Sequence, residues 1–293
     1  MSLLTLTAGD WRATVAPEQG GAILSLDWRG QPVFRPTPDG ATDMLETACF
    51  PLVPYANRIA DARFTFEGRD ERLTALDRFA PHALHGDGWL NPWTVEAASD
   101  DRIEMVLDWP GEVDADGAGW PWPWRARQTV RLTDAGLEIA LSVTNTGDAV
   151  MPAGLGLHPY FHKATDCRLS LSAQGVWLTD AREIPERLAP PDAVVDWSGG
   201  LALADAPFVD HAYAGWDGQA VMDGGGRRVT LRGGGGAEWA QVYAPVGEDY
   251  FCVEPVTHRP DVLNAPPGEQ GGLARLLPGE SLNLAMTVTA EAL

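Results

Sequence analysis

Apolar and polar residues alternate along much of this chain. Every second residue is a large apolar one from Leu137 to Val143, and the same holds from Leu282 to Val288. Shorter runs of this kind lie at 11–15, 24–28, 103–107, 130–132, 169–171, 176–178 and 229–231. A period of two is typical of strands with one buried face. No long segment has the 3.6-residue period of a helix. We therefore predict a single all-β domain over residues 1–293, built as a sandwich of antiparallel sheets.

Two stretches interrupt the alternation, at 42–61 and 180–207. We expect both to be long loops, and long loops in compact domains are usually functional or mobile. The glycine run Gly233–Gly236 is expected to connect a hairpin. It does not match a phosphate-binding loop, because that motif's lysine and following helix are missing.

Composition narrows the range of partners. The 293 residues carry 41 acidic and 21 basic side chains, a formal net charge of −20. Nucleic acids and anionic membrane surfaces require clusters of Lys and Arg, so we expect neither as a partner. The three cysteines are widely spaced, as expected for reduced thiols in the cytoplasm. The opening stretch MSLLTLTAGDW has no basic region of the kind found in signal peptides, and no apolar run approaches the ~20 residues of a membrane helix.

Polar side chains with possible chemistry fall in four segments. "PYANRIADARF" holds Asn57 and Arg58, and "PHALHGDGWLNPW" holds His85. "GLGLHPYF" holds His158, and "FCVEPVTHRPDVLN" holds Glu254.

Glu254 follows a run that is typical of a buried strand. A buried carboxylate is costly unless it is paired or protonated. It is therefore either a structural ion pair, for example with Arg259, or a catalytic group.

His158 has the same two interpretations, a satisfied core histidine or a proton donor. Pro159 stiffens the exit from its strand, and Tyr160 and Phe161 could shield the imidazole.

The remaining histidines carry weaker signals. His82 and His85 are three residues apart, but two imidazoles in a turn without a third ligand are weak evidence for a metal. We expect His85 to be a hydrogen-bonding group at a pocket rim. His162, His211 and His258 are expected to be structural or exposed. No G-x-S-x-G motif of a serine hydrolase occurs.

Taken in order, these segments resemble the aldose 1-epimerase (mutarotase) family. The matching pieces are "NRIADARFTFEG", "LHGDGWLNPW", the stretch from "WPWPWRARQTV" to "GLGLHPYF", "CVEPVTHRPDVLN" and "LLPGESLNL". They extend from about Gly20 to Thr287. The resemblance implies a galactose-mutarotase-like β-supersandwich with antiparallel sheets.

The resemblance also implies roles for single residues. Glu254 would be the general base and His158 the general acid. Arg58 and His85 would bind sugar oxygens, with Asn57 beside them. Asp210, in "FVDHAY", would bind a sugar hydroxyl. Many relatives have Asn where His162 stands.

The implied function is a cofactor-independent, metal-free aldose 1-epimerase that interconverts the α and β anomers of a free aldose. Two alternatives stay open at this point. One is the same reaction on a phosphorylated or sulfonated sugar, with Arg63, Arg259 and Arg227–Arg228 as candidate anion-binding groups. The other is a carbohydrate-binding protein without catalysis. A small sugar is the expected partner, and the chain is expected to be a monomer or a dimer.

Overall fold

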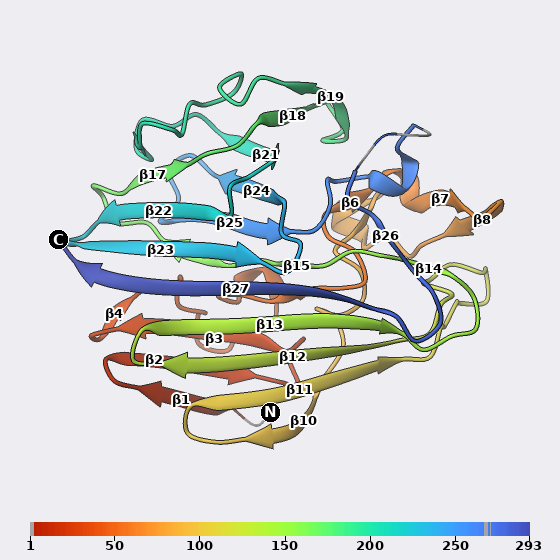
Figure 1. Cartoon of the computed structure of the whole chain (residues 1–293), viewed down its shortest axis with the longest axis horizontal. Coiled ribbons are helices and arrows are strands. Elements are labelled where there is room, and N and C mark those ends of the chain that lie inside the picture. Colours follow the sequence, from red (N-terminus) through yellow and green to blue (C-terminus); the bar gives the residue numbers. More distant parts are fainter. Residues whose placement is uncertain (1–2, 267–268, 270) are drawn as a thin grey trace.

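The fold is almost entirely antiparallel β structure (Figure 1). The computed structural model describes residues 3–266, 269 and 271–293. In this part of the chain the only helical segments are single 3₁₀ turns: η1 (Met44–Glu46), η2 (Ala60–Ala62), η3 (Asp77–Phe79) and η4 (Val262–Asn264). None of them has the length or the apolar character needed to cross a bilayer. The all-β prediction is therefore confirmed, whereas the extent of the domain stays a prediction.

The largest sheet has nine strands. In spatial order they are β10 (Thr94–Ala98), β11 (Arg102–Trp109), β12 (Trp124–Thr133), β13 (Gly136–Asn145), β27 (Ser281–Ala292), β23 (Arg227–Gly234), β22 (Gln219–Gly224), β17 (Arg168–Leu171) and β20 (Leu201–Ala202). Six of these strands contain the alternating runs of the sequence.

An eight-stranded sheet forms part of the second layer. Its order is β19 (Pro185–Ala189), β18 (Gly175–Thr179), β21 (Val209–Ala214), β24 (Trp239–Ala244), β25 (Tyr250–Val256), β15 (Gly156–Leu157) and β5 (Pro51–Leu52), and β16 (Tyr160–His162) also pairs with β25.

Smaller sheets complete the molecule. Four strands form the sheet β1 (Leu4–Ala8), β2 (Trp11–Ala16), β3 (Ala22–Trp28) and β4 (Gln31–Pro32). A bridge from Ile23 to Cys49 joins this sheet to the chain that enters β5. Three two-stranded antiparallel sheets are β6 (Arg58–Ile59) with β9 (Ala83–Leu84), β7 (Arg63–Phe66) with β8 (Arg69–Arg72), and β14 (Met151–Ala153) with β26 (Ala274–Leu276).

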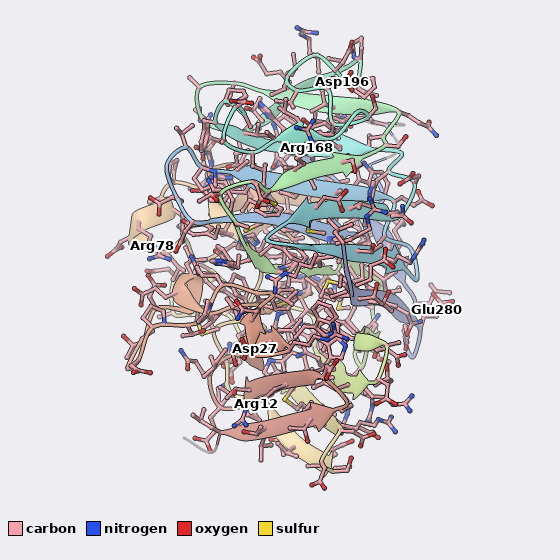
Figure 2. All side chains as sticks on the ribbon, turned by 90° about the vertical axis from the view of Figure 1, so that its left-hand side faces the viewer. Arg12, Asp27, Arg78, Arg168, Asp196 and Glu280 are labelled. Carbon is pink, nitrogen blue, oxygen red and sulfur yellow. The ribbon has the colours of Figure 1, made fainter. Side chains whose placement is uncertain are left out.

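The two faces of the eight-stranded sheet bury different sets of side chains. On β25, Phe251 and Val253 join the main hydrophobic core, which also contains Leu141 of β13. Cys252, which lies between them, and Val256 at the end of the strand belong to a second, smaller cluster. Successive side chains of a strand point to opposite faces, so the even-numbered residues of β25 face away from the main core. Side chains fill the space between the layers, and charged ones such as Arg78 and Glu280 lie at the periphery (Figure 2).

The two predicted loops contain more regular structure than expected. The stretch 42–61 includes β5, β6 and η1, and 180–207 includes β19 and β20. Neither stretch is therefore one continuous loop, although most residues of both lie outside strands and 3₁₀ turns. Strands of two residues are too short to show any alternation, and this is why the pattern missed most of them.

Gly154, one of the glycines that precede His158, leaves space for the ring of His258. It lies between β14 and β15, and a Cβ at this position would be 2.0 Å from Cδ2 of His258. The His258 ring accepts a hydrogen bond from the Ala56 N–H at Nε2 (3.1 Å) and bonds the Arg259 carbonyl through Nδ1 (2.7 Å). His258 is thus a structural histidine that holds the chain leading to Asn57, and it needs the space that glycine leaves.

We expect Gly154→Ala to displace the His258 ring and to lower the free energy of unfolding by about 1–3 kcal/mol, the cost of overpacking and of a lost buried hydrogen bond. Urea unfolding followed by tryptophan fluorescence measures this. Gly199→Ala is the matched control, because its Cβ would meet open space. Equal stability of Gly154→Ala and wild type would show that the ring can move without cost.

Candidate active site

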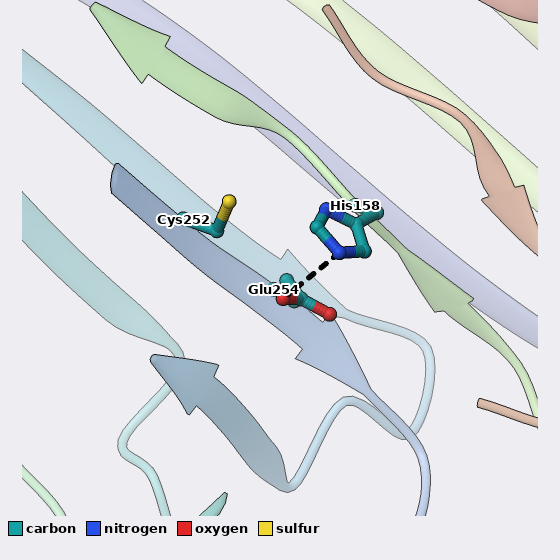
Figure 3. Close-up of side chains that lie close together, drawn as sticks. All are labelled: His158, Cys252 and Glu254. Carbon is teal, nitrogen blue, oxygen red and sulfur yellow. Dashed lines mark ion pairs between the residues drawn. The ribbon is translucent and has the colours of Figure 1, made fainter. Parts of the chain in front are cut away.

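The strand register places Glu254 directly opposite His158. β25 runs antiparallel to β15 and β16, with Gly156 opposite Val256 and Tyr160 opposite Cys252. His158 lies midway between these pairs and therefore faces Glu254. Pro159 has no N–H and breaks the ladder at this point. The His158 Nε2 atom lies 3.4 Å from Glu254 Oε1 (Figure 3). Both residues are buried, with 6% and 3% of their surface exposed.

Two aromatic rings stack on the His158 imidazole. The centroid of Phe50 lies 4.7 Å from that of the imidazole, and the centroid of Tyr160 lies 4.6 Å from it. The backbone N–H of His158 also donates to the Phe50 carbonyl (3.0 Å). The expected second shield, Phe161, instead stacks on Phe251 because it points to the opposite face of the sheet. Phe50 was not foreseen, since it lies just before β5, more than a hundred residues earlier in the chain.

Arg35 supports this aromatic stack from behind. Its guanidinium carbon lies 4.0 Å from the centroid of Tyr160 and 4.3 Å from that of Tyr250. The same group donates hydrogen bonds to the carbonyls of Leu45 (2.6 Å) and Thr47 (3.0 Å). A cation between two ring faces is stabilised by both. The rotamer of Tyr160, and with it the plane of the His158 ring, is held in this way.

His85 and Asn57 hold each other in unusual backbone conformations. Both have positive φ angles, 63° and 60°. The Asn57 N–H donates to His85 Nδ1 (3.1 Å), and the His85 N–H donates to the Asn57 carbonyl (3.0 Å). Because Nδ1 accepts a hydrogen bond, the hydrogen of the neutral ring is on Nε2. His85 can therefore act as a hydrogen-bond donor to a ligand.

Charged side chains surround Arg58 at the mouth of the site. Its guanidinium forms an ion pair with Glu183, and its Nη1 atom lies 3.7 Å from Asp210 Oδ2. Asp210 also accepts a hydrogen bond from Gln241 Nε2 (2.6 Å). Gln241 stands opposite Glu254 in the β24–β25 ladder, so the carboxylates of Asp210 and Glu254 share one face of the sheet. Sequence analysis did not identify Glu183 or Gln241.

These residues line one cleft of about 210 Å³. All six residues proposed from the sequence contribute to it: Asn57, Arg58, His85, His158, Asp210 and Glu254. Its other walls are apolar or aromatic, formed by Leu45, Phe79, Leu84, Tyr160, Tyr243 and Tyr250. The structure thus brings the proposed site residues together, from β6 and the residue before it, the residue after β9, β21, β25 and the segment between β15 and β16. A shape that combines apolar walls with a few convergent polar groups is typical of a small-molecule site.

Other candidates lie elsewhere. The Nε atom of Arg259 pairs with Glu269 at 2.5 Å, so the alternative in which this arginine neutralises Glu254 is wrong. Arg228 pairs with Asp223 on the nine-stranded sheet. The His82 ring accepts a hydrogen bond from the Asp61 N–H (3.0 Å), and His82 does not line the cleft.

Burial shifts the pKa values of Glu254, His158 and His85 in the direction that favours the neutral form of each group. It raises the pKa of Glu254 well above its ordinary value, and the nearby charge of Asp210 acts in the same direction. Burial lowers the pKa of His158 to about 3 and also lowers that of His85. Removal from water disfavours any charge, which explains both directions. Burial therefore favours the uncharged forms of both His158 and Glu254.

The arrangement can accept one proton from a small ligand and donate another to it, through two groups in contact at one wall of the cleft. One further group is close: the possible ligand atoms of His158, Cys252 and Glu254 all lie within 4.8 Å of one another (Figure 3).

Several known proteins resemble this chain over nearly its whole length. The family model for aldose 1-epimerase matches residues 2–289. The uncharacterized protein YphB of Escherichia coli K12 is 34% identical over 99% of both chains. The solved structure of a candidate aldose 1-epimerase from E. coli K12 superposes with a TM-score of 0.88 at 31% identity, covering 100% of this chain and 99% of the other.

A galactose mutarotase-like protein from Clostridium acetobutylicum has the same fold, with a TM-score of 0.85 at 20% identity, covering 99% of this chain and 95% of that one. The predicted galactose-mutarotase-like supersandwich is confirmed. The match over nearly the whole chain, together with the fold, shows that this protein belongs to the aldose 1-epimerase family.

Proposed function

We propose that this protein interconverts the α and β anomers of a free, uncharged aldose. The observation that carries the proposal is the contact between His158 and Glu254, a buried imidazole and carboxyl group 3.4 Å apart at the floor of an open cleft. Change of anomer requires that the sugar ring open. The anomeric hydroxyl must lose a proton while the ring oxygen gains one, and a paired base and acid perform both transfers.

In the proposed reaction, Glu254 takes the proton of the anomeric hydroxyl and His158 protonates the ring oxygen. Rotation about the C1–C2 bond then presents the other face of the aldehyde, and the two transfers reverse. Arg58 and the Nε2 hydrogen of His85 would stabilise charge that develops on sugar oxygens. Asp210 would accept a hydrogen bond from a hydroxyl group.

The proton count of the pair is consistent with this reaction. A neutral His158 with a protonated Glu254 holds the same number of protons as an imidazolium with a carboxylate. The two forms differ by one proton transfer across the 3.4 Å contact. Burial favours the neutral form, whereas ring opening starts from the charged form. The polar groups of a bound sugar, with Arg58 beside Glu254, would supply the stabilisation that the charged form needs.

The charges at the mouth favour a neutral substrate. Arg58 lines the cleft, and Arg78 and Arg182 line a neighbouring hollow that Arg58 also borders. Each is paired with a carboxylate: Arg58 with Glu183, Arg78 with Asp43, and Arg182 with Asp61. Arg227, Arg228 and Arg259 do not line the cleft. A phosphate or sulfonate group would have to compete with these carboxylates, in a protein of net charge −20.

Glu254→Gln keeps the size of the side chain and removes the proton acceptor. We expect turnover to fall about 10²-fold or more, while sugar binding is largely retained. NMR exchange spectroscopy measures anomer exchange above the spontaneous rate for glucose, galactose, xylose and arabinose. Glu238→Gln, at an exposed position, is the control and should match wild type. Near-normal exchange by Glu254→Gln would place the base elsewhere, and no catalysis by wild type with any sugar would favour a non-catalytic binding protein.

The pH profile tests the shared proton. The active pair holds one proton, and it gains a second only when the neutral ring is protonated, which the lowered pKa of His158 delays to acidic pH. It loses the last proton only above the raised pKa of Glu254. We therefore expect kcat/KM to change less than about twofold across the ordinary histidine pKa of about 6.5. A steep titration centred there would contradict burial of the pair.

Glu183→Gln removes the carboxylate that occupies Arg58. The ratio of kcat/KM for glucose over glucose 6-phosphate should exceed one in wild type and should fall about fivefold in the variant, the effect of one partly exposed charge of about 1 kcal/mol. Glu186→Gln, on the same hairpin and exposed, is the control. Faster exchange of glucose 6-phosphate than of every neutral sugar by wild type would overturn the preference.

A further inference from the structure

Cys252 is a buried thiol that the proposed reaction does not use. It lies two residues before Glu254 on β25, so both side chains point to the same face of the sheet. Its ligand atom, one imidazole nitrogen of His158 and one carboxyl oxygen of Glu254 lie within 4.8 Å of one another. Figure 3 shows the thiol and the carboxylate rising from one strand, with the imidazole facing both.

The spacing of these atoms is close to that of a metal site. Three atoms separated by at most 4.8 Å have a common point within about 2.8 Å of each, and Zn²⁺ needs about 2.0–2.3 Å to N, O and S ligands. The His158–Glu254 distance of 3.4 Å already equals the separation of two ligands around a tetrahedral zinc ion. Side-chain shifts of well under 1 Å complete the site.

The chemistry of the donors selects the class of metal. An imidazole, a thiolate and a carboxylate together suit Zn²⁺, Co²⁺ or Cd²⁺, and a thiolate disfavours Mg²⁺ and Ca²⁺. Three protein ligands leave the fourth position for water on the side of the open cleft. The ion can enter there, because His158 and Glu254 both line the cleft. On binding, the thiol and the carboxyl group release their protons to solvent.

We infer that His158, Cys252 and Glu254 form a binding site for a thiophilic divalent cation such as Zn²⁺, and that an ion bound there inhibits the enzyme. Inhibition rests on the proposed function: the ion occupies both proton carriers and the space between them and the sugar. Zinc and sugar then compete, so a higher sugar concentration raises the zinc concentration needed for half-inhibition.

Cobalt spectroscopy tests the site without reference to activity. Titration of the wild-type protein with CoCl₂ should give a near-ultraviolet thiolate-to-cobalt charge-transfer band that saturates at one ion and disappears on addition of ZnCl₂. Cys252→Ser and Cys252→Ala should lack the band. Cys167→Ser, which changes another buried cysteine outside the cleft, should retain it. Absence of the band in wild type, or its loss in Cys167→Ser alone, overturns the proposal.

Anomer exchange tests the inhibition. ZnCl₂ should inhibit the wild type, EDTA should reverse this, and MgCl₂ should have no effect. Both Cys252 variants should keep their basal rate and need at least tenfold more zinc. Equal zinc sensitivity of wild type and both variants overturns the inhibitory site. If wild type shows no exchange at all, the cobalt band still decides whether the metal site exists, which separates failure of this inference from failure of the proposed function.

Discussion

Removal of a carboxyl group and an imidazole from water is the constraint on which the site depends. Glu254 and His158 face each other on antiparallel strands, and neither has an arginine or lysine as its direct partner in the described residues. A full charge on either alone would be expensive in this environment. Their contact of 3.4 Å is the only ion pair that either group makes among the described residues. Phe50 and Tyr160 make the surroundings of the imidazole apolar, while the open side of the cleft leaves room for a polar ligand.

One strand serves both stability and chemistry. On β25, Phe251 and Val253 bury their side chains between the two large sheets, and Cys252 and Glu254 point to the other side. The packed side fixes the backbone, so the position of Glu254 is set by the main core rather than by a surface loop. Residues on rigid strands hold catalytic geometry more accurately than residues on mobile loops. His85, directly after β9, and Arg58, on the two-residue strand β6, lie outside the two large sheets.

The sequence predicted the sheets where one face is polar and the other is buried. β13 and β27 alternate cleanly, whereas β24 is buried on nearly every residue and shows no alternation. The six site residues were found through short motifs, and their joint position in one cleft follows from the fold. Phe50, Glu183 and Arg35 could not be found, because their roles arise only when distant segments meet. Glu183 in particular lies in a stretch that carried no motif and reaches Arg58 from the turn between β18 and β19.

The hairpin that carries Glu183 has a further consequence for how such proteins diversify. Asp180 Oδ1 caps its tip by accepting hydrogen bonds from the N–H groups of Arg182 (2.8 Å) and Ile184 (3.0 Å), and β19 behind it is the outermost strand of its sheet. Its strands are anchored in the main core through Val176 and Ala189, whereas its tip reaches Arg58 through Glu183. Exchanges at the tip would change the charge around Arg58 and leave those buried strand residues in place. Selection, natural or in the laboratory, can therefore act on the tip separately from the core.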